Sequence, residues 1–271
     1  MFTRIRYGVI VTWMAGLLLL GGSHAWGQGG KMITFCLDPL NMPYSQQFAQ
    51  PPGFDMEIGG LIAEFLQRES GIFWADTGTR GGLGRAMRNS INAGQCNAFM
   101  GIVSDPRQDA ELEEKGLVLT APYMAVSMVV IVREDSPKIT QVGDLAAIRP
   151  AIQAGTISHG VMIRKRWKHG LHRFLDQALE AVASKESSVA LLFGPKAGWS
   201  MMQNFQGRGI SISKDFVPEP DLLWSLGIAV HKDDPQLKQD LERAIDQLIT
   251  ENKIAPILEK YGVPWIDPRN R

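Results

Sequence analysis

The sequence contains few cysteines and no long hydrophobic segment, and its charge is balanced. Its 271 residues include 28 Lys and Arg against 28 Asp and Glu, so the formal net charge is zero. A balanced chain lacks the excess positive charge with which proteins hold nucleic acid or anionic membrane surfaces. The apolar stretch at residues 9–20 is shorter than the roughly 20 residues that span a bilayer. We therefore expect neither nucleic acid as a partner nor a membrane-spanning protein.

This apolar stretch has the features of an export signal. Arg4 and Arg6 precede it, and the small residues Ser23 and Ala25 follow it. A basic start, a short apolar core and a small-x-small site predict a signal peptide, residues 1–25, that is cleaved after Ala25. Its removal leaves 26 basic against 28 acidic residues. We expect the mature protein in the periplasm, without an attached lipid because no cysteine stands directly after the cleavage position.

The two cysteines, Cys36 and Cys96, both belong to the predicted mature chain. In an oxidising compartment they can pair in a disulfide, or they can remain as two small buried thiols. A catalytic role is the weakest interpretation, since no histidine lies near either residue in sequence. His169 and His172 are separated by Gly170 and lack a third ligand nearby, so we expect no metal site.

From residue 32 onward, short apolar runs alternate with amphipathic stretches of helical period. This alternation is typical of an α/β protein with largely parallel strands. A helix is predicted from about residue 57 to a stop at Gly71, and a long helix from Pro235 with a buried face every three to four residues. The length permits two moderate cores, and no linker-like segment separates them. We therefore expect two lobes joined by close strand crossings.

Six segments in a fixed order resemble the family 3 extracellular solute-binding proteins, which have the type II periplasmic-binding-protein fold. They are CLDPLNMPYS (36–45), GFDMEIGGLIAEFL (53–66), NSINAGQCNAFMGI (89–102), LTAPY (119–123), AIQAGTISH (151–159) and GIAVHKDDP (227–235). Together they cover nearly the whole mature chain. The resemblance implies lobe I from residues 26–123, lobe II from 124–226, a return to lobe I over 227–271, and a ligand cleft at the two hinge crossings.

One branch of that family is more similar than the others. Residues 189–199, VALLFGPKAGW, resemble a strand that ends in Gly-Pro-x-Ala-Gly-aromatic in the periplasmic J-type accessory proteins, which are encoded with quinoprotein methanol and alcohol dehydrogenases. The cysteine before Asp-Pro and the Ala-Gly-x-Cys at 93–96 point to the same branch. This resemblance implies a quinoprotein dehydrogenase or its cytochrome c as the partner.

The sequence departs from the amino-acid-binding members of the family at two positions. Those members place an arginine after a Thr-Pro-x segment for the carboxylate of the ligand, whereas Arg107 here is offset by one residue. They place an aspartate after the strand of lobe II for the ammonium group, and Gly194 and Pro195 stand there instead. An ammonium without its carboxylate partner is poorly compensated inside a closed cleft. Ordinary amino-acid transport is therefore disfavoured.

The candidate residues of the cleft come from loops at the ends of predicted strands. Asp38, Asn41 and Tyr44 follow the first strand, where Tyr44 either stacks on a ligand or packs as a lid over the core. Tyr123 ends the LTAPY segment. Gly155 and Thr156 begin a helix, so they either receive an anion through backbone N–H groups or form an ordinary N-cap.

The remaining candidates are Arg80, Arg107, Gly194, Pro195 and Trp199. Arg80 lies in a glycine-rich stretch that resembles a phosphate-binding loop but lacks its Lys-Ser/Thr ending, so a plain loop is the simpler interpretation. Gly194 and Pro195 either shape the cleft or form an edge that contacts a partner. Trp199 is either a core residue or a contact.

Three classes of function remain. We expect an accessory protein without enzymatic activity or cofactor that docks to a quinoprotein dehydrogenase or its cytochrome. The alternative is the substrate-binding component of an ABC importer for a small polar solute or amino acid, which would close on its ligand and meet a permease. The third is an enzyme on the same fold, such as a prephenate or arogenate dehydratase-like protein, for which fold reuse is the only argument.

Overall fold

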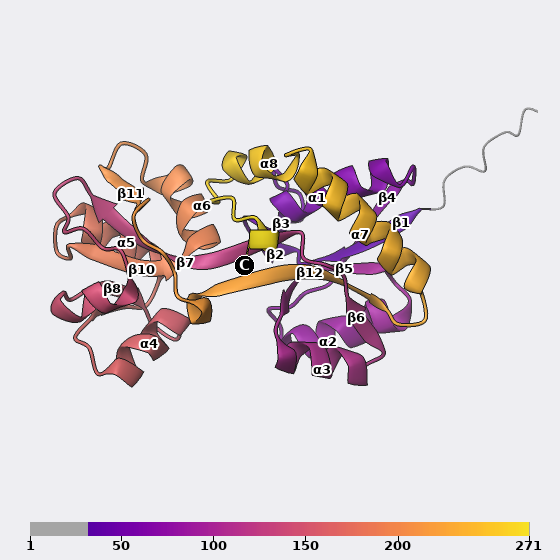
Figure 1. The fold of residues 1–271 in the computed structure, drawn as a ribbon, viewed down its shortest axis with the longest axis horizontal. Coiled ribbons are helices and arrows are strands. Elements are labelled where there is room, and N and C mark those ends of the chain that lie inside the picture. The colour runs from indigo at the N-terminus through magenta and orange to yellow at the C-terminus, as the bar shows by residue number, and fades with distance from the viewer. Residues whose placement is uncertain (1–31, 271) are drawn as a thin grey trace, which may run out of the picture.

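The computed structural model describes residues 32–270, and these residues form two lobes connected by two long strands (Figure 1). The predicted signal peptide, residues 1–25, lies outside the described residues. Among residues 32–270, no helix combines the length and apolar character that crossing a membrane requires.

Lobe I contains the first strands of the chain and its last helices. Strand β1 pairs in parallel with β4 on one side, with Ile33 opposite Ser70, and with β5 on the other, with Phe35 opposite Ala98. The strands are β1 (Ile33–Leu37), β4 (Ser70–Trp74), β5 (Ala98–Ser104) and β6 (Leu117–Leu119). The helices are α1 (Phe54–Phe65), α2 (Gly82–Asn89), α3 (Pro106–Glu114), α7 (Pro235–Thr250) and α8 (Ile254–Lys260).

Lobe II repeats this layering around a smaller sheet. Strand β10 pairs in parallel with β8, and β8 pairs in parallel with β9, which forms the edge. The strands are β8 (Ala151–Gln153), β9 (Gly170–His172), β10 (Val189–Phe193) and β11 (Ile210–Ile212). The helices are α4 (Ile157–Lys165), α5 (Leu175–Ala183) and α6 (Gly194–Asn204).

Two strands, β7 (Met124–Arg133) and β12 (Leu223–His231), belong to both lobes. They pair with each other in antiparallel register from Met124 opposite Leu226 to Ser127 opposite Leu223. Beyond this pairing, β7 continues beside β10 and β11, and β12 continues beside β5 and β6. One sheet therefore runs through the molecule. The expectation of largely parallel strands was wrong, because every pairing made by the two crossing strands is antiparallel.

Short elements complete the chain between these layers. A small hairpin of β2 (Leu40–Asn41) and β3 (Ser45–Gln46) follows β1. Among residues 32–270, three 3₁₀ turns lie at connections, namely η1 (Ile91–Ala93), η2 (Val142–Ala147) and η3 (Pro220–Leu222), and η4 (Pro268–Asn270) follows the last helix.

Hydrophobic cores cover both faces of the sheet in each lobe because side chains alternate along a strand. In lobe I, Phe35 packs under α1 and α7, whereas its neighbour Cys36 belongs to the opposite core with α2. In lobe II, Leu191 and Leu192 enter opposite cores in the same way. The predicted buried face of α7 is present: all of its six apolar positions are buried, namely Leu237, Leu241, Ala244, Ile245, Leu248 and Ile249.

Two predicted details of lobe I differ in the structure. Helix α1 begins at Phe54 and ends at Phe65, and the chain leaves it through Gln67 in a left-handed conformation with φ 53°. Gly71, predicted as the stop, lies in β4 instead, where a side chain would meet Met32 and Thr34 of the adjacent segment. Glycine therefore serves close strand packing at this position.

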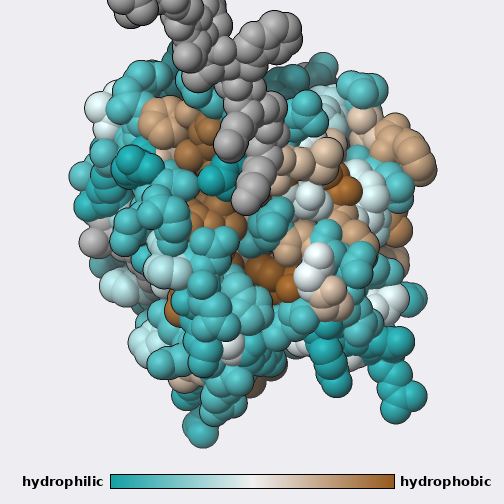
Figure 2. Space-filling model, turned by 90° about the vertical axis from the view of Figure 1, so that its right-hand side faces the viewer, coloured by the Kyte–Doolittle hydropathy of each residue, from teal (hydrophilic) through white to brown (hydrophobic). Residues whose placement is uncertain are grey.

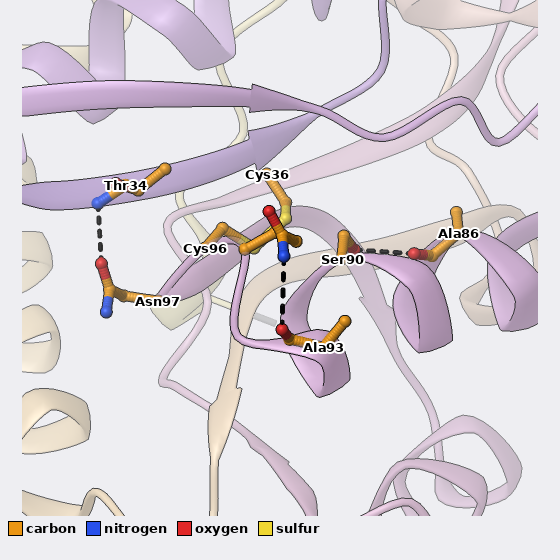
Figure 3. Close-up of a disulfide and its surroundings, with 8 residues drawn as sticks. Thr34, Cys36, Ala86, Ser90, Ala93, Cys96 and Asn97 are labelled. Carbon is orange, nitrogen blue, oxygen red and sulfur yellow. Dashed lines mark hydrogen bonds between the residues drawn. A yellow bond between two sulfur atoms is a disulfide. The ribbon is translucent and has the colours of Figure 1, made fainter.

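A disulfide joins Cys36 of β1 to Cys96, which precedes β5 (Figure 3). Nearby, the backbone N–H of Thr34 donates to the side-chain oxygen of Asn97 at 2.9 Å, so β1 and the start of β5 are held together twice. The end of lobe I seen in Figure 2 is mostly hydrophilic where described residues are visible, with hydrophobic residues gathered in recesses. On this face, polar side chains therefore surround the hydrophobic residues.

Candidate functional site

A cavity of about 610 Å³ lies where the hinge strands meet the two lobes. This volume falls within the range of ordinary small-molecule sites. Lobe I supplies most of the wall through β1, β5 and the loops that follow them, while lobe II supplies Ile157, Phe193 and Lys196. The apolar wall consists of Leu37, Leu83, Phe99, Met100, Ile102, Val103, Val126, Ile157, Phe193, Trp224 and Leu226.

Asp38 leaves the carboxyl end of β1 and shapes the rim of this cavity. Its carboxylate accepts the backbone N–H of Leu40 at 2.7 Å, the backbone N–H of Thr77 at 2.9 Å and the hydroxyl of Thr77. These bonds join the loop after β1 to the loop after β4. Asp38 lines the cavity, but its carboxylate already has protein donors.

Tyr44 also lines the cavity, and its ring packs 4.6 Å from the ring of Phe54 at the start of α1. The side chain is buried, and burial, with the nearby Asp55 carboxyl, raises the pKa of its hydroxyl well above the usual value. The ring of Tyr44 therefore covers the core of lobe I and also forms part of the cavity wall, and its stacking on a ligand stays a prediction.

Asp55, in the first turn of α1, is the most strongly buried carboxyl at the cavity, with 3% of the residue exposed. It accepts a hydrogen bond of 2.7 Å from the hydroxyl of the fully buried Tyr123. Gly101, at φ 77°, lies against it, and a side chain there would meet the Asp55 carboxyl at 3.3 Å. Desolvation raises the pKa of Asp55 to about 7, and the Tyr123 hydrogen bond opposes this rise. The sequence motifs placed Tyr123 near the cleft, but its contact with Asp55 is a finding of the structure.

Lys196, in the first turn of α6, reaches from lobe II into lobe I. Its ammonium donates to the side-chain oxygen of Asn41 at 2.8 Å and to the backbone carbonyl of Met42. It lies 6.0 Å from the centre of the Tyr44 ring. Desolvation lowers the pKa of Lys196 to about 8, and the Asp38 carboxylate opposes this effect.

A second contact between the lobes lies farther along α6. A side chain at Gly198 would meet the carbonyl oxygen of Gly262, after α8, at 1.9 Å. Beside this approach, the rings of Trp199 and Tyr261 lie 5.7 Å apart. Trp199 is half-buried and packs against the core of lobe I, so it joins the lobes and does not line the cavity.

The other predicted residues lie outside the cavity wall. Gly194 and Pro195 are buried at the start of α6, where a side chain at Gly194 would meet the Ser127 carbonyl of β7 at 2.8 Å. Thr156 occupies the N-cap position of α4 and donates its hydroxyl to Gln153. The backbone N–H of Gly155 points to the ring nitrogen of His159 at 3.2 Å.

The two arginines among the candidates also lie outside this cavity. Arg80 is exposed, and its backbone carbonyl accepts from the side chain of Arg85. Arg107 lines a second hollow of about 550 Å³, together with Arg164 and Asp221. Neither guanidinium therefore stands in the wall of the 610 Å³ cavity, where the carboxylate of an amino acid would need it.

Sequence reasoning missed Asp55 and Lys196 as site residues. Asp55 lay within the quoted GFDMEIGG segment, and a carboxyl one residue into an amphipathic helix usually faces solvent. Lys196 carried a usable signal, because a lysine in the first turn of a helix opposes the helix dipole and so calls for a compensating partner. Within residues 32–270, no group of His, Cys, Asp and Glu is arranged to hold a metal ion.

The cavity is suited to enclosing an apolar body and to fixing a few polar atoms at its rim. Structures of several proteins share this fold. The L-cystine solute receptor of Neisseria gonorrhoeae, in its unliganded open conformation, is similar with a TM-score of 0.71 and 17% identity over 87% of this chain and 94% of that chain. No curated protein sequence matches the chain.

Two further structures are similar at comparable identity. MxaJ from Methlophaga aminisulfidivorans MPT has a TM-score of 0.64 and 18% identity over 86% of this chain and 100% of that one. The periplasmic binding protein XoxJ from Methylobacterium extorquens AM1 has a TM-score of 0.59 and 21% identity over 87% and 99%. At these identities the likeness shows the fold, which is the type II periplasmic-binding-protein fold. A family model matches residues 33–264, so the chain belongs to the bacterial extracellular solute-binding proteins, family 3, which are in general binding proteins rather than enzymes.

Proposed function

We propose that this protein is a periplasmic accessory factor of a quinoprotein methanol or alcohol dehydrogenase system, and that it docks to the dehydrogenase or to its cytochrome c. The observation that carries the proposal is the position of Lys196. The ammonium from lobe II contacts lobe I in the cleft itself, at the helix start where an amino-acid receptor would present an acidic group to its ligand.

The cavity wall supports the same proposal. It contains no arginine for a carboxylate, and two of its acids serve the protein itself: Asp38 joins two loops and Asp105 caps α3. The ammonium of Lys196 lies in the wall but already donates to Asn41 and Met42. The carboxylate of a free amino acid would therefore meet no unengaged positive charge, which is costly in a desolvated site. The Gly-Pro-x-Ala-Gly-aromatic segment, residues 194–199, and the shared fold of MxaJ and XoxJ are consistent with an accessory role.

Affinity capture tests this proposal directly. The tagged mature protein is mixed with the purified quinoprotein dehydrogenase and cytochrome c of the same bacterium at low ionic strength, and the bound fraction is identified. We expect one of them to be retained. Retention of neither, under conditions in which the protein is folded, would remove the accessory role from consideration.

The alternative is capture of a small solute for an ABC importer, and the cavity of about 610 Å³ is the observation that favours it. Its wall selects an apolar body rather than a zwitterion. A thermal-shift screen of small apolar and weakly polar compounds tests this function, since a ligand at 100 times its Kd stabilises a protein by about 2.7 kcal/mol. A hit at micromolar concentration together with no retained partner would favour the importer.

A further inference from the structure

Three groups of lobe I form a small site for a positive charge at the hinge side of the cleft. They are the Asn41 side-chain oxygen, the Met42 backbone carbonyl and the face of the Tyr44 ring, and the Asp38 carboxylate acts on the same point. We call these groups the cation seat. Neutral oxygens and an aromatic face are the groups that replace water around a desolvated ammonium.

The local structure of α6 makes a lysine unfavourable where Lys196 stands. The residue is third in the helix, after Gly194 and Pro195, so its charge faces the positive end of the helix dipole. It is also largely desolvated, which lowers its pKa to about 8. The contacts with lobe I offset both costs, so the position of Lys196 depends on an interaction across the cleft.

The close approach of Gly198 to Gly262 sets the position of the lysine. Because no side chain separates these backbones, α6 lies directly against the end of lobe I, and Figure 1 shows α6 on the side of lobe II that faces lobe I. Lys196, two residues earlier, then spans the remaining distance to the hairpin of β2 and β3.

We infer that the cation seat is a binding site for a primary ammonium group, that Lys196 fills it from within the chain, and that this contact ties the two lobes together without a solute. The protein therefore needs no captured ligand to set its interlobe angle. Solutes with a primary amine are excluded from the seat as long as Lys196 occupies it. This inference goes beyond the proposed function and stands whether or not a dehydrogenase is the partner.

Occupation of the seat is tested by emptying it. K196A removes the ammonium and most of the side chain, and n-propylammonium has the matching length and charge. We expect the variant to bind n-propylammonium with a Kd at least about tenfold below that of the wild-type protein, measured by calorimetry. The uncharged 1-propanol should not bind K196A more tightly than the wild type. The double variant N41A/K196A should lose the increased affinity for n-propylammonium. Equal affinity of wild type and K196A for n-propylammonium would overturn the seat.

The tie between the lobes is tested by distance measurement. Spin labels are attached at R88C in α2 and K165C in α4, where the native residues are exposed. The two helices lie on the same side of the two lobes in Figure 1, so double electron–electron resonance between the labels reports the interlobe distance. We expect one narrow distribution without ligand and a broader, longer one in K196M. Lys138, an exposed lysine of lobe II, provides the control K138M, which should match wild type.

N41A removes one acceptor from lobe I without changing α6 and should give an intermediate distribution. It also covers the case in which K196M folds poorly. If the distance distributions are the same in wild type, K196M and N41A, Lys196 does not hold the two lobes together. Because these experiments need only the protein itself, their failure is distinct from a failure of partner capture.

Discussion

The two lobes share a layered architecture but differ in charge. With residues 124–226 taken as lobe II, that lobe has 12 Lys and Arg against 9 Asp and Glu, whereas the described remainder, lobe I, has 12 against 19. The near-neutral chain is therefore an acidic lobe joined to a basic one. Much of the positive charge lies in residues 164–173, which contain five Lys and Arg and no acid. Balanced composition conceals two surfaces that would attract different partners.

The lobes also differ in how they are stabilised and in what they give to the cleft. Lobe I contains the disulfide and most of the cavity wall, including the buried Asp55. Lobe II, in which the described residues include no cysteine, contributes one apolar side chain from α4, one from β10 and the ammonium of Lys196, beside the apolar side chains of the crossing strands β7 and β12. Lobe I is thus the preformed half of the site, and lobe II supplies the contact that closes it.

Loss of the disulfide, which only lobe I contains among the described residues, should have the largest effect on stability. A crosslink between residues 60 apart restricts the unfolded chain by about 4 kcal/mol in the loop-entropy description. We expect C36A/C96A to lower the free energy of unfolding by about that amount, measured by urea denaturation. Reducing agent should lower the stability of the wild type but leave the variant unchanged. If the agent also destabilises the variant, the loss of stability does not come from the disulfide.

The pH dependence of lobe I should follow Asp55. Its folded pKa of about 7 lies above the usual value of 3.8, so between these values the folded state holds a proton that the unfolded state has lost. Stability therefore falls as pH rises from about 4 to 7, by an amount on the order of 4 kcal/mol. We expect D55N, whose amide oxygen can still accept from Tyr123, to flatten this fall in urea denaturation at pH 5 and pH 8. The exposed control D221N should keep the wild-type slope.

Adding a single methyl group at Gly198 should break the contact between α6 and lobe I. G198A places its side chain 1.9 Å from the Gly262 carbonyl, so one backbone must move, at a cost of about 2 kcal/mol. We expect a lower melting temperature and a longer distance between the labels in α2 and α4. G60A in α1 is the matched control, because nothing lies within 4 Å of the new methyl group. Alanine should raise stability there by up to about 1 kcal/mol.

Reversal of charge in lobe II should have the smallest effect on stability. R164E/K168E changes two exposed residues of the basic segment, and surface substitutions of this kind stay within about 0.5 kcal/mol. We expect weaker retention on a cation-exchange resin than for the same reversal at K138E/K214E, at an unchanged melting temperature. Equal losses of retention for the two pairs of substitutions would show that the basic segment is not the dominant positive surface.

Patterns of short range predicted much of the fold. The period of α7 predicted its buried face, and the alternation of apolar runs with amphipathic stretches predicted the α/β class. The helix stop at Gly71 was wrong because α1 already ends at Phe65, and Gly71 packs closely against the side chains of Met32 and Thr34 within β4. The parallel character of the sheet was overestimated because apolar runs do not reveal the direction of strand pairing.

The site was harder to predict, since its contacts join residues that are distant in sequence. Asn41 and Lys196 are 155 residues apart, and only the crossing strands bring them together. The burial of Asp55 depends on Gly101, whose left-handed backbone leaves room for the carboxyl. The sequence could place Asp38, Asn41 and Tyr44 in a loop directly after a strand, and all three line the cavity. Arg80 and Arg107 lie outside it.

The paired crossing of β7 and β12 also determines the order in which the exported chain can fold. Lobe II is complete once residue 226 has emerged, and Cys36 and Cys96 are both available much earlier. The core of lobe I, however, needs Leu241 and Ile245 of α7 and Leu258 of α8. The lobe that begins the polypeptide is therefore the last to be finished, and until then the inner face of α1 lacks the cover that α7 and α8 provide.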